Sequence, residues 1–177
     1  MQREEIIIPV KLDARTFRRF SRFDALRLRK KWRRPAVFAL ILVAFAAVAL
    51  FSGKEQSGLI AAVLLAVGLG LPLVYFGTFF SQVNAQAARF GLDRPRAVYT
   101  VTLGPEGVRA TNDRREEAAA KVQWKDVQAA FRAKGCVYLY VNAARAFLLP
   151  DGQGDASPEE LWAFLEKHMG DRCRDVR

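Results

Sequence analysis

The sequence predicts an α+β membrane protein. A two-helix transmembrane hairpin is preceded by an amphipathic basic helix and followed by a small antiparallel β domain with a C-terminal helix. Three observations lead to this fold class. Two long stretches lack any charged residue, basic residues gather on their outer flanks, and much of the second half of the chain alternates between apolar and polar residues. The 51% hydrophobic and 26% charged residues of this 177-residue chain are thus separated into regions.

The transmembrane hairpin is predicted over residues 35–80, with one span at residues 35–53 and the other at residues 58–80. Neither span contains a charged residue, and about 20 apolar residues in a helix cross a hydrocarbon core of roughly 30 Å. A core helix of a soluble protein would carry a polar face, which both spans lack. A cleavable signal peptide is the competing interpretation of the first span. It is disfavoured because the following linker has no A-x-A-like cleavage site and leads directly into the second span.

The charges beside the spans predict the orientation of the chain. Residues 1–34 hold 12 Lys and Arg against 4 Asp and Glu, whereas the linker at residues 52–57 holds one residue of each sign. Because positively charged flanks stay in the cytoplasm, we expect a multi-pass protein with both termini cytoplasmic. Basic and aromatic residues at the cytoplasmic ends of the spans should then contact a bilayer with anionic headgroups. These anchors are Arg29, Lys30, Lys31, Trp32, Arg33, Arg34, Tyr75, Phe79 and Phe80.

Small residues recur every four positions along the second span, at Ala62, Ala66 and Gly70. This spacing allows the backbones of two membrane helices to approach closely. We interpret the three residues as the packing face between the two helices of the hairpin. The alternative is a face between two copies of the chain in a homo-oligomer. The absence of charged groups from both spans argues against a transporter or a proton channel.

The N-terminal arm, residues 1–34, should contain a strand and a basic helix. Residues 5–12 read as a strand, and Pro9 restricts that strand to the edge of a sheet. Asp13 is a plausible N-cap for a helix that starts near Ala14. This helix either lies in the membrane interface and holds anionic headgroups, or packs its phenylalanines on the C-terminal domain. Its apolar face consists of Phe17, Phe20, Phe23, Leu26 and Leu28.

The C-terminal domain is predicted over residues 97–170, as about six short antiparallel strands followed by a helix. Ser157, Pro158 and Glu160 form the pattern of a helix N-terminus with a capping box, and Gly170 should end that helix. Residues 124–127 read as a corner where the chain leaves the sheet. The strands are expected at residues 97–103, 108–112, 117–123, 127–133, 137–141 and 144–149.

Several stretches match a known family: the aromatic run Phe17, Phe20 and Phe23, the pair of spans, and residues 99–107, 122–127, 137–140 and 147–150. Over nearly all of its length the chain resembles the YcxB-like proteins, a bacterial family of membrane proteins. The resemblance implies a pleckstrin-homology-like (PH-like) fold for residues 97–170 and a location in the bacterial cytoplasmic (inner) membrane. It brings no catalytic residue and no established ligand.

Few residues could carry chemistry. His168 is the single histidine, and Cys136 and Cys173 form no CxxC pair, so the sequence predicts neither a metal site nor a cofactor. Motifs for nucleophilic hydrolysis or phosphate binding are missing. Residues 97–177 hold 12 basic and 12 acidic residues. A nucleic-acid-binding domain should be basic, so we expect no nucleic-acid partner.

These observations favour a non-enzymatic protein. The leading hypothesis is a membrane-tethered binding or scaffolding module that presents the β domain at the inner leaflet to a protein, peptide or lipid headgroup. The alternative is a small channel or an export component built from oligomerised hairpins, for which the Ala/Gly stripe is the motivation.

Overall fold

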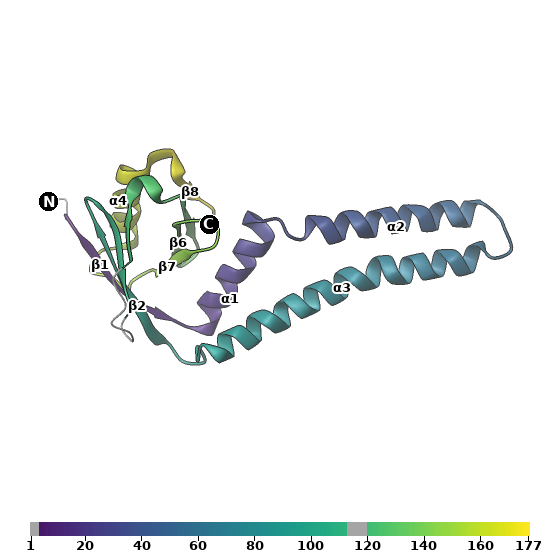
Figure 1. Ribbon diagram of the computed structural model, residues 1–177, viewed down its shortest axis with the longest axis horizontal. Helices are drawn as coiled ribbons and strands as arrows, with labels where there is room; N and C mark the ends of the chain where they lie inside the picture. Colours follow the sequence, from purple (N-terminus) through teal and green to yellow (C-terminus); the bar gives the residue numbers. More distant parts are fainter. Residues whose placement is uncertain (1–3, 113–119) are drawn as a thin grey trace. The chain divides into compact units, whose positions relative to one another are not determined.

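The computed structural model describes residues 4–112 and 120–177 of the chain. It divides into two compact units, one formed by Met1–Phe20 with Gly91–Arg177 and the other by Ser21–Phe90. We call the first unit the β domain and the second the hairpin unit (Figure 1). The hairpin unit is inserted between the first two strands of the β domain. The β domain therefore includes residues on both sides of the predicted range 97–170.

The first sheet of the β domain contains the N-terminal strand. Its strands are β1 (Ile6–Leu12), β2 (Arg96–Gly104), β3 (Gly107–Thr111) and β4 (Ala120–Gln123), antiparallel neighbours in that order. The predicted edge position of the strand that contains Pro9 is confirmed, since β1 is outermost in this sheet. Of the predicted strand at residues 117–123, residues 117–119 lie outside the described residues.

The second sheet has the order β7-β6-β5-β8. Its strands are β5 (Ala129–Ala133), β6 (Cys136–Tyr140), β7 (Ala146–Pro150) and β8 (Cys173–Asp175). β8 pairs with β5 in parallel, which differs from the purely antiparallel domain that the sequence predicted. Three residues are too few to show an alternating pattern, so the sequence carries no signal for β8. A 3-10 turn, η2 (Trp124–Asp126), forms the predicted corner between the two sheets.

The C-terminal helix α4 (Pro158–Met169) begins as predicted. The Ser157 hydroxyl accepts a hydrogen bond from the Glu160 amide, and the Glu160 carboxylate accepts one from the Ser157 amide. This capping box satisfies two amides that the first turn of a helix leaves without partners. Gly170 follows the helix with a φ of 54°, which glycine adopts without strain. Buried side chains of α4 are Leu161, Trp162, Leu165 and Met169.

The core of the β domain draws on both sheets and α4. β1 shows why its residues form a strand, because Ile6, Ile8, Val10 and Leu12 are buried while the residues between them are exposed. Burying one leucine or isoleucine side chain contributes about 1.5–3 kcal/mol relative to leaving it in water. The largest fully buried side chains are Ile8, Val10, Val101, Leu103, Val108, Val127, Val137, Leu139, Leu149 and Leu165.

The hairpin unit consists of a short π-helix, η1 (Phe23–Leu28), and two long helices, α2 (Arg33–Phe51) and α3 (Ser57–Arg89). α2 and α3 contact each other along their length and run in opposite directions (Figure 1). A further helix, α1 (Ala14–Arg22), follows β1, and the Asp13 carboxylate caps it by accepting a hydrogen bond from the Thr16 amide at 2.8 Å. The predicted cap is thus confirmed.

α3 is longer than the predicted span at residues 58–80, because it continues to Arg89. The polar stretch after Phe80 contains no helix-breaking residue, and Val83 and Ala87 are buried in it. The helix ends before Gly91, which has a φ of 63°. The end of an apolar run is therefore not the end of the helix that contains it.

Candidate membrane interface

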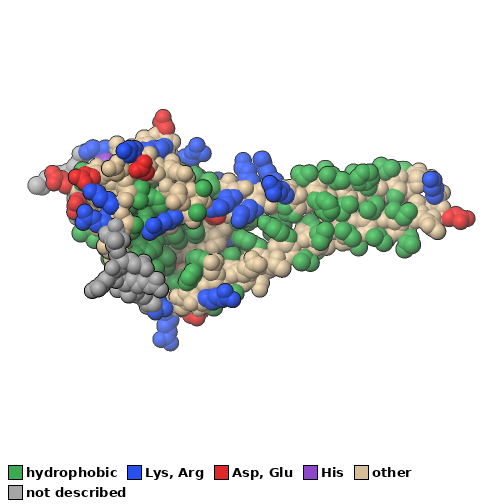
Figure 2. Space-filling view, in the orientation of Figure 1, with side chains coloured by type: hydrophobic (Ala, Val, Ile, Leu, Met, Phe, Trp, Pro, Cys, Tyr) green, Lys and Arg blue, Asp and Glu red, His purple; other side chains and the backbone are tan. Residues whose placement is uncertain are grey.

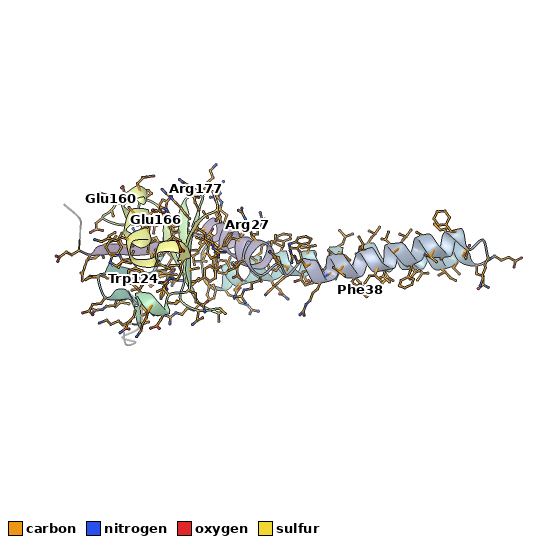
Figure 3. The ribbon with its side chains drawn as sticks, turned by 90° about the horizontal axis from the view of Figure 1, so that it is seen from above. Arg27, Phe38, Trp124, Glu160, Glu166 and Arg177 are labelled. Carbon is orange, nitrogen blue, oxygen red and sulfur yellow. The ribbon has the colours of Figure 1, made fainter. Side chains whose placement is uncertain are left out.

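The surface of α2 and α3 is apolar along both helices. Figure 2 shows hydrophobic side chains covering the visible face of the hairpin, with basic groups where α2 begins and one group of each sign at the connecting loop. Leu40, Leu73 and Phe51 are 71%, 72% and 91% exposed. Phe38, labelled in Figure 3, is 46% exposed. Both helices are long and apolar enough to cross a membrane.

The contact between α2 and α3 uses small residues. A Cβ atom added to Gly68 would lie 3.1 Å from Leu42 Cβ and 3.5 Å from the Ala39 carbonyl oxygen. Ala46 of α2 and Ala61 of α3 are also buried. The absence of side-chain bulk at these positions lets the two backbones approach closely.

The predicted packing residues lie elsewhere on α3. Ala62 and Ala66 are exposed, and no atom of α2 lies within 4 Å of the place where Gly70 would carry a Cβ atom. The prediction that these three residues pack inside the hairpin is therefore wrong. A four-residue period fits several faces of one helix, and the face that meets α2 is set by Ala61 and Gly68. The alternative, a contact between two copies of the chain, stays a prediction.

Two of the predicted aromatic anchors, Trp32 and Tyr75, lie at one level of the hairpin. Ala39 lies beside Gly68, and antiparallel helices advance by the same rise per residue. Trp32, seven residues before Ala39, is therefore level with Tyr75, seven residues after Gly68. Trp32 is 44% exposed and Tyr75 is 37% exposed.

The remaining aromatic anchors, Phe79 and Phe80, are half-buried on α3 just beyond Tyr75. Their rings meet edge to face, with centroids 5.3 Å apart. The guanidinium of Arg22 lies over the Phe80 ring at 5.1 Å, within the range of a cation–π contact. Trp32, Tyr75, Phe79 and Phe80 thus mark one end of the apolar surface.

The predicted basic anchors occupy the turn between η1 and α2 and the first two positions of α2. Arg29, Lys30, Lys31, Arg33 and Arg34 are all exposed. The Arg29 Nε atom lies 2.8 Å from a carboxylate oxygen of Asp24, and Lys30, just before α2, has a φ of 48° in the left-handed region. These basic side chains thus lie at the same end of the hairpin as the aromatic anchors (Figure 2).

The phenylalanines of the basic helix were open to two interpretations, and Phe20 packs on the β domain. Its ring lies 5.2 Å from the ring of Tyr138 and 6.1 Å from that of Tyr140, both in β6. Tyr138 is 2% exposed, and its burial raises the pKa of its hydroxyl to about 12. Phe17 and Phe20 lie on the side of α1 opposite Arg15 and Arg18.

A loop of the β domain closes the free edge of β1. The Gln153 side chain accepts a hydrogen bond from the Lys11 amide at 2.7 Å and donates one to the Lys11 carbonyl at 2.9 Å. Asp155 does the same for Ile7, with its carboxylate accepting at 3.1 Å and its amide donating at 3.3 Å. These residues, which we call the edge clamp, imitate a neighbouring strand on either side of Pro9, and this protects the edge from pairing with other chains. No local pattern in the sequence revealed the edge clamp.

The aromatic residues near α4 are part of the core. Trp124 is buried, and its indole nitrogen donates a hydrogen bond to the Gly104 carbonyl at 2.8 Å (Figure 3). The His168 ring stacks on Trp124 with centroids 5.1 Å apart, and its Nδ1 atom lies 2.8 Å from the Phe164 carbonyl oxygen. Arg172 donates hydrogen bonds to the carbonyls of Trp124 and Val127, which holds the corner against the end of α4.

Reactive groups are sparse in the β domain. Burial raises the pKa of Cys136 to about 12 and that of Cys173 to about 11, so both thiols remain protonated at neutral pH. Among the described residues, no group of three His, Cys, Asp or Glu side chains could hold a metal ion. A shallow hollow of about 290 Å³ lies against Gly104 and Arg109, and there the Lys121 ammonium pairs with the Glu106 carboxylate at 2.6 Å. Oppositely charged groups thus neutralise each other in the hollow.

No protein-family model, curated protein or solved structure matches the chain.

Proposed function

We propose that this chain is an integral protein of a bacterial cytoplasmic membrane, crosses the bilayer twice and keeps both termini in the cytoplasm. The carrying observation is the exposed apolar surface of α2 and α3, with exposed cations and aromatic side chains at one end. α2 has 19 residues and is therefore about 28 Å long, close to the thickness of a hydrocarbon core. The cation-rich end faces the cytoplasm.

In this proposal the β domain is a non-enzymatic binding or scaffolding module at the inner leaflet. Four strands in one sheet, three further antiparallel strands in a second and a C-terminal helix are the parts of a PH-like fold, and their order here supports that assignment. The YcxB-like resemblance of the sequence supports it as well. A protein, peptide or lipid headgroup is the proposed ligand of the module, and nucleic acid is left out of the proposal because the charges of residues 97–177 balance.

The alternative is a small channel or export component formed by several hairpins. One observation favours it, namely that Ala62 and Ala66 face away from α2 and are free to contact another helix. Light scattering of the protein in detergent distinguishes the two functions. A monomer would contradict the channel. A defined oligomer of the unchanged protein that dissociates to monomers when Ala62 and Ala66 are both replaced by leucine would favour the channel.

Topology mapping tests the leading proposal. Gln56→Cys places a thiol in the loop between α2 and α3, and Lys134→Cys places one on the exposed surface of the β domain. Both changes are made in a Cys173→Ser background, in which the buried Cys136 does not label. An impermeant maleimide should label the Gln56→Cys protein in intact cells, and the Lys134→Cys protein only after the membrane is opened. The reverse pattern, or release of the full chain into water by alkaline extraction, would contradict the proposal.

A further inference from the structure

The outer face of α1 carries four arginines. Arg15, Arg18, Arg19 and Arg22 project within an arc of about 100° on a helix of 3.6 residues per turn, and all four are exposed. No ion pair joins any of them to an acidic group within the described parts of the chain. This arginine face is therefore a concentrated positive charge beside a β domain whose remaining charges balance.

The opposite face of α1 is already occupied. Phe20 contacts Tyr138 and Tyr140, and Phe17 shares that side of the helix. An amphipathic helix normally binds a bilayer by burying its apolar face among acyl chains. α1 cannot do so while Phe20 lies on β6, so attraction between the arginines and anions is the remaining route to a membrane.

The covalent structure keeps α1 close to the first span. η1 and the four residues Arg29–Trp32 are all that separate α1 from α2. The arginine face therefore stays within a short tether of the headgroup layer. Polybasic segments beside a span are attracted to anionic leaflets.

We propose that the arginine face of α1 binds the phosphate groups of anionic phospholipids in the inner leaflet, without insertion of the helix. This inference rests on the membrane location proposed above. The binding is electrostatic, falls with salt and draws the β domain toward the bilayer. It differs from anchoring by the basic residues at positions 29–34, because Arg15, Arg18 and Arg19 belong to the β domain.

Photo-crosslinking in nanodiscs tests this inference. A photoreactive amino acid replaces Arg18 in the full chain, in discs of phosphatidylcholine with or without phosphatidylglycerol, and adducts are identified by mass. A phosphatidylglycerol adduct is expected, with a much lower yield at about 0.5 M salt. A matched photoreactive residue at Arg109, on the first sheet, should give little adduct.

Charge variants separate attraction from a structural role of the arginines. Each basic residue near an anionic surface changes affinity roughly fivefold, so Arg15→Gln with Arg19→Gln should reduce the adduct yield at least about tenfold. Arg15→Lys with Arg19→Lys should retain it, since a diffuse anionic surface accepts either cation. Equal loss in both pairs would overturn the inference.

The remaining outcomes are equally decisive. Equal yields at residues 18 and 109, or no lipid adduct at residue 18, would refute binding at this face. An adduct to nucleic acid or to a protein in cells would assign the arginine face to that partner instead. If the chain integrates with the expected topology but gives no lipid adduct, this inference alone fails. If the chain does not integrate, the proposed function fails first.

Discussion

Leucine occupies opposite environments in the two units of this molecule. In the β domain, Leu103, Leu139 and Leu149 are completely buried. In the hairpin unit, Leu40 and Leu73 are more than two-thirds exposed. The β domain removes its leucines from water by packing them on each other, whereas the hairpin unit needs an apolar solvent to do this. The buried leucines of the β domain therefore contribute to its folding stability, whereas the exposed leucines of the hairpin unit indicate that this unit prefers an apolar solvent.

The largest expected effect comes from truncating a core leucine. Leu139→Ala should destabilise the β domain by about 2–5 kcal/mol, because it opens a cavity in a packed core. Leu73→Ala removes the same atoms from an exposed position on α3 and should leave the β domain unchanged. Thermal unfolding followed by near-ultraviolet circular dichroism in detergent measures both variants. Equal shifts would break the contrast between the two units.

The next effect tests the solvent directly. Leu69→Arg places a charge in the middle of the predicted span at residues 58–80, where Leu69 is 57% exposed, and should disfavour membrane insertion by about 2.5–3.5 kcal/mol. Ile7→Arg is the control, since Ile7 is 47% exposed in the β domain and its side chain faces water. The fraction of chain that resists alkaline extraction measures insertion. Full integration of the Leu69→Arg protein would contradict a span at this position.

A third prediction concerns the contact between α2 and α3. Gly68→Leu should push the helices apart, because even a Cβ atom there would lie 3.1 Å from Leu42, and overpacking costs about 1–3 kcal/mol. Gly70→Leu should have no such effect, since nothing lies within 4 Å of its missing Cβ. The distance between spin labels at Phe45 and Val63 reports the separation. If Gly70→Leu widened it instead, the assigned contact face would be incorrect.

A smaller effect is expected at helix ends. Ser157→Ala removes the N-cap of α4 and should cost about 0.5–2 kcal/mol in unfolding free energy. In the hairpin unit, Ser52 donates to the Ala49 carbonyl at 2.7 Å at the end of α2, and Ser52→Ala should not affect unfolding of the β domain. Thermal unfolding of both variants provides the comparison, and an unchanged Ser157→Ala protein would dispute the role of the cap.

The smallest expected effect is a loss of stability of the β domain at high pH, and it is absent at neutral pH. Burial raises the pKa of Tyr138 to about 12 from an ordinary value of 10.0, and it also raises the pKa of Tyr99. Below the ordinary value both hydroxyls are protonated whether the chain is folded or unfolded. As the pH rises above about 10, the unfolded chain loses these protons first, so the stability of the β domain should fall. Tyr138→Phe should reduce the slope of stability against pH between about 10 and 12, and an unaltered slope would exclude Tyr138 as its source.

Local signals in the sequence predicted much of this fold. The capping box at Ser157 and Glu160, the edge strand around Pro9 and the two long helices each depend on residues that are close in the chain. The basic residues from Arg29 to Arg34 are exposed as expected, and their role as membrane anchors stays a prediction. A charged or aromatic residue beside an apolar run can be recognised from the sequence without knowledge of the tertiary structure.

Features that depend on distant pairing could not be predicted. β8 exists because Cys173 lies beside Ala130, and the edge clamp exists because Gln153 reaches Lys11 across 142 positions. The face of α3 that meets α2 depends on which small residues oppose Leu42, and a repeat of alanines does not specify this. The periodicity of a sequence predicts which residues share one face of a helix or strand, but it does not predict which distant element that face contacts.

The insertion of the hairpin unit between β1 and β2 decides how a water-soluble fragment should be made. A truncation that starts near residue 97 would lack β1 and leave β2 as a bare, adhesive edge. The Ala14 amide donates to the Leu92 carbonyl at 2.9 Å, so the two ends of the excised stretch are adjacent. Splicing Asp13 to Asp93 through a short glycine linker would retain both sheets, and Tyr138 and Tyr140, whose rings Phe20 contacts, would need polar replacements.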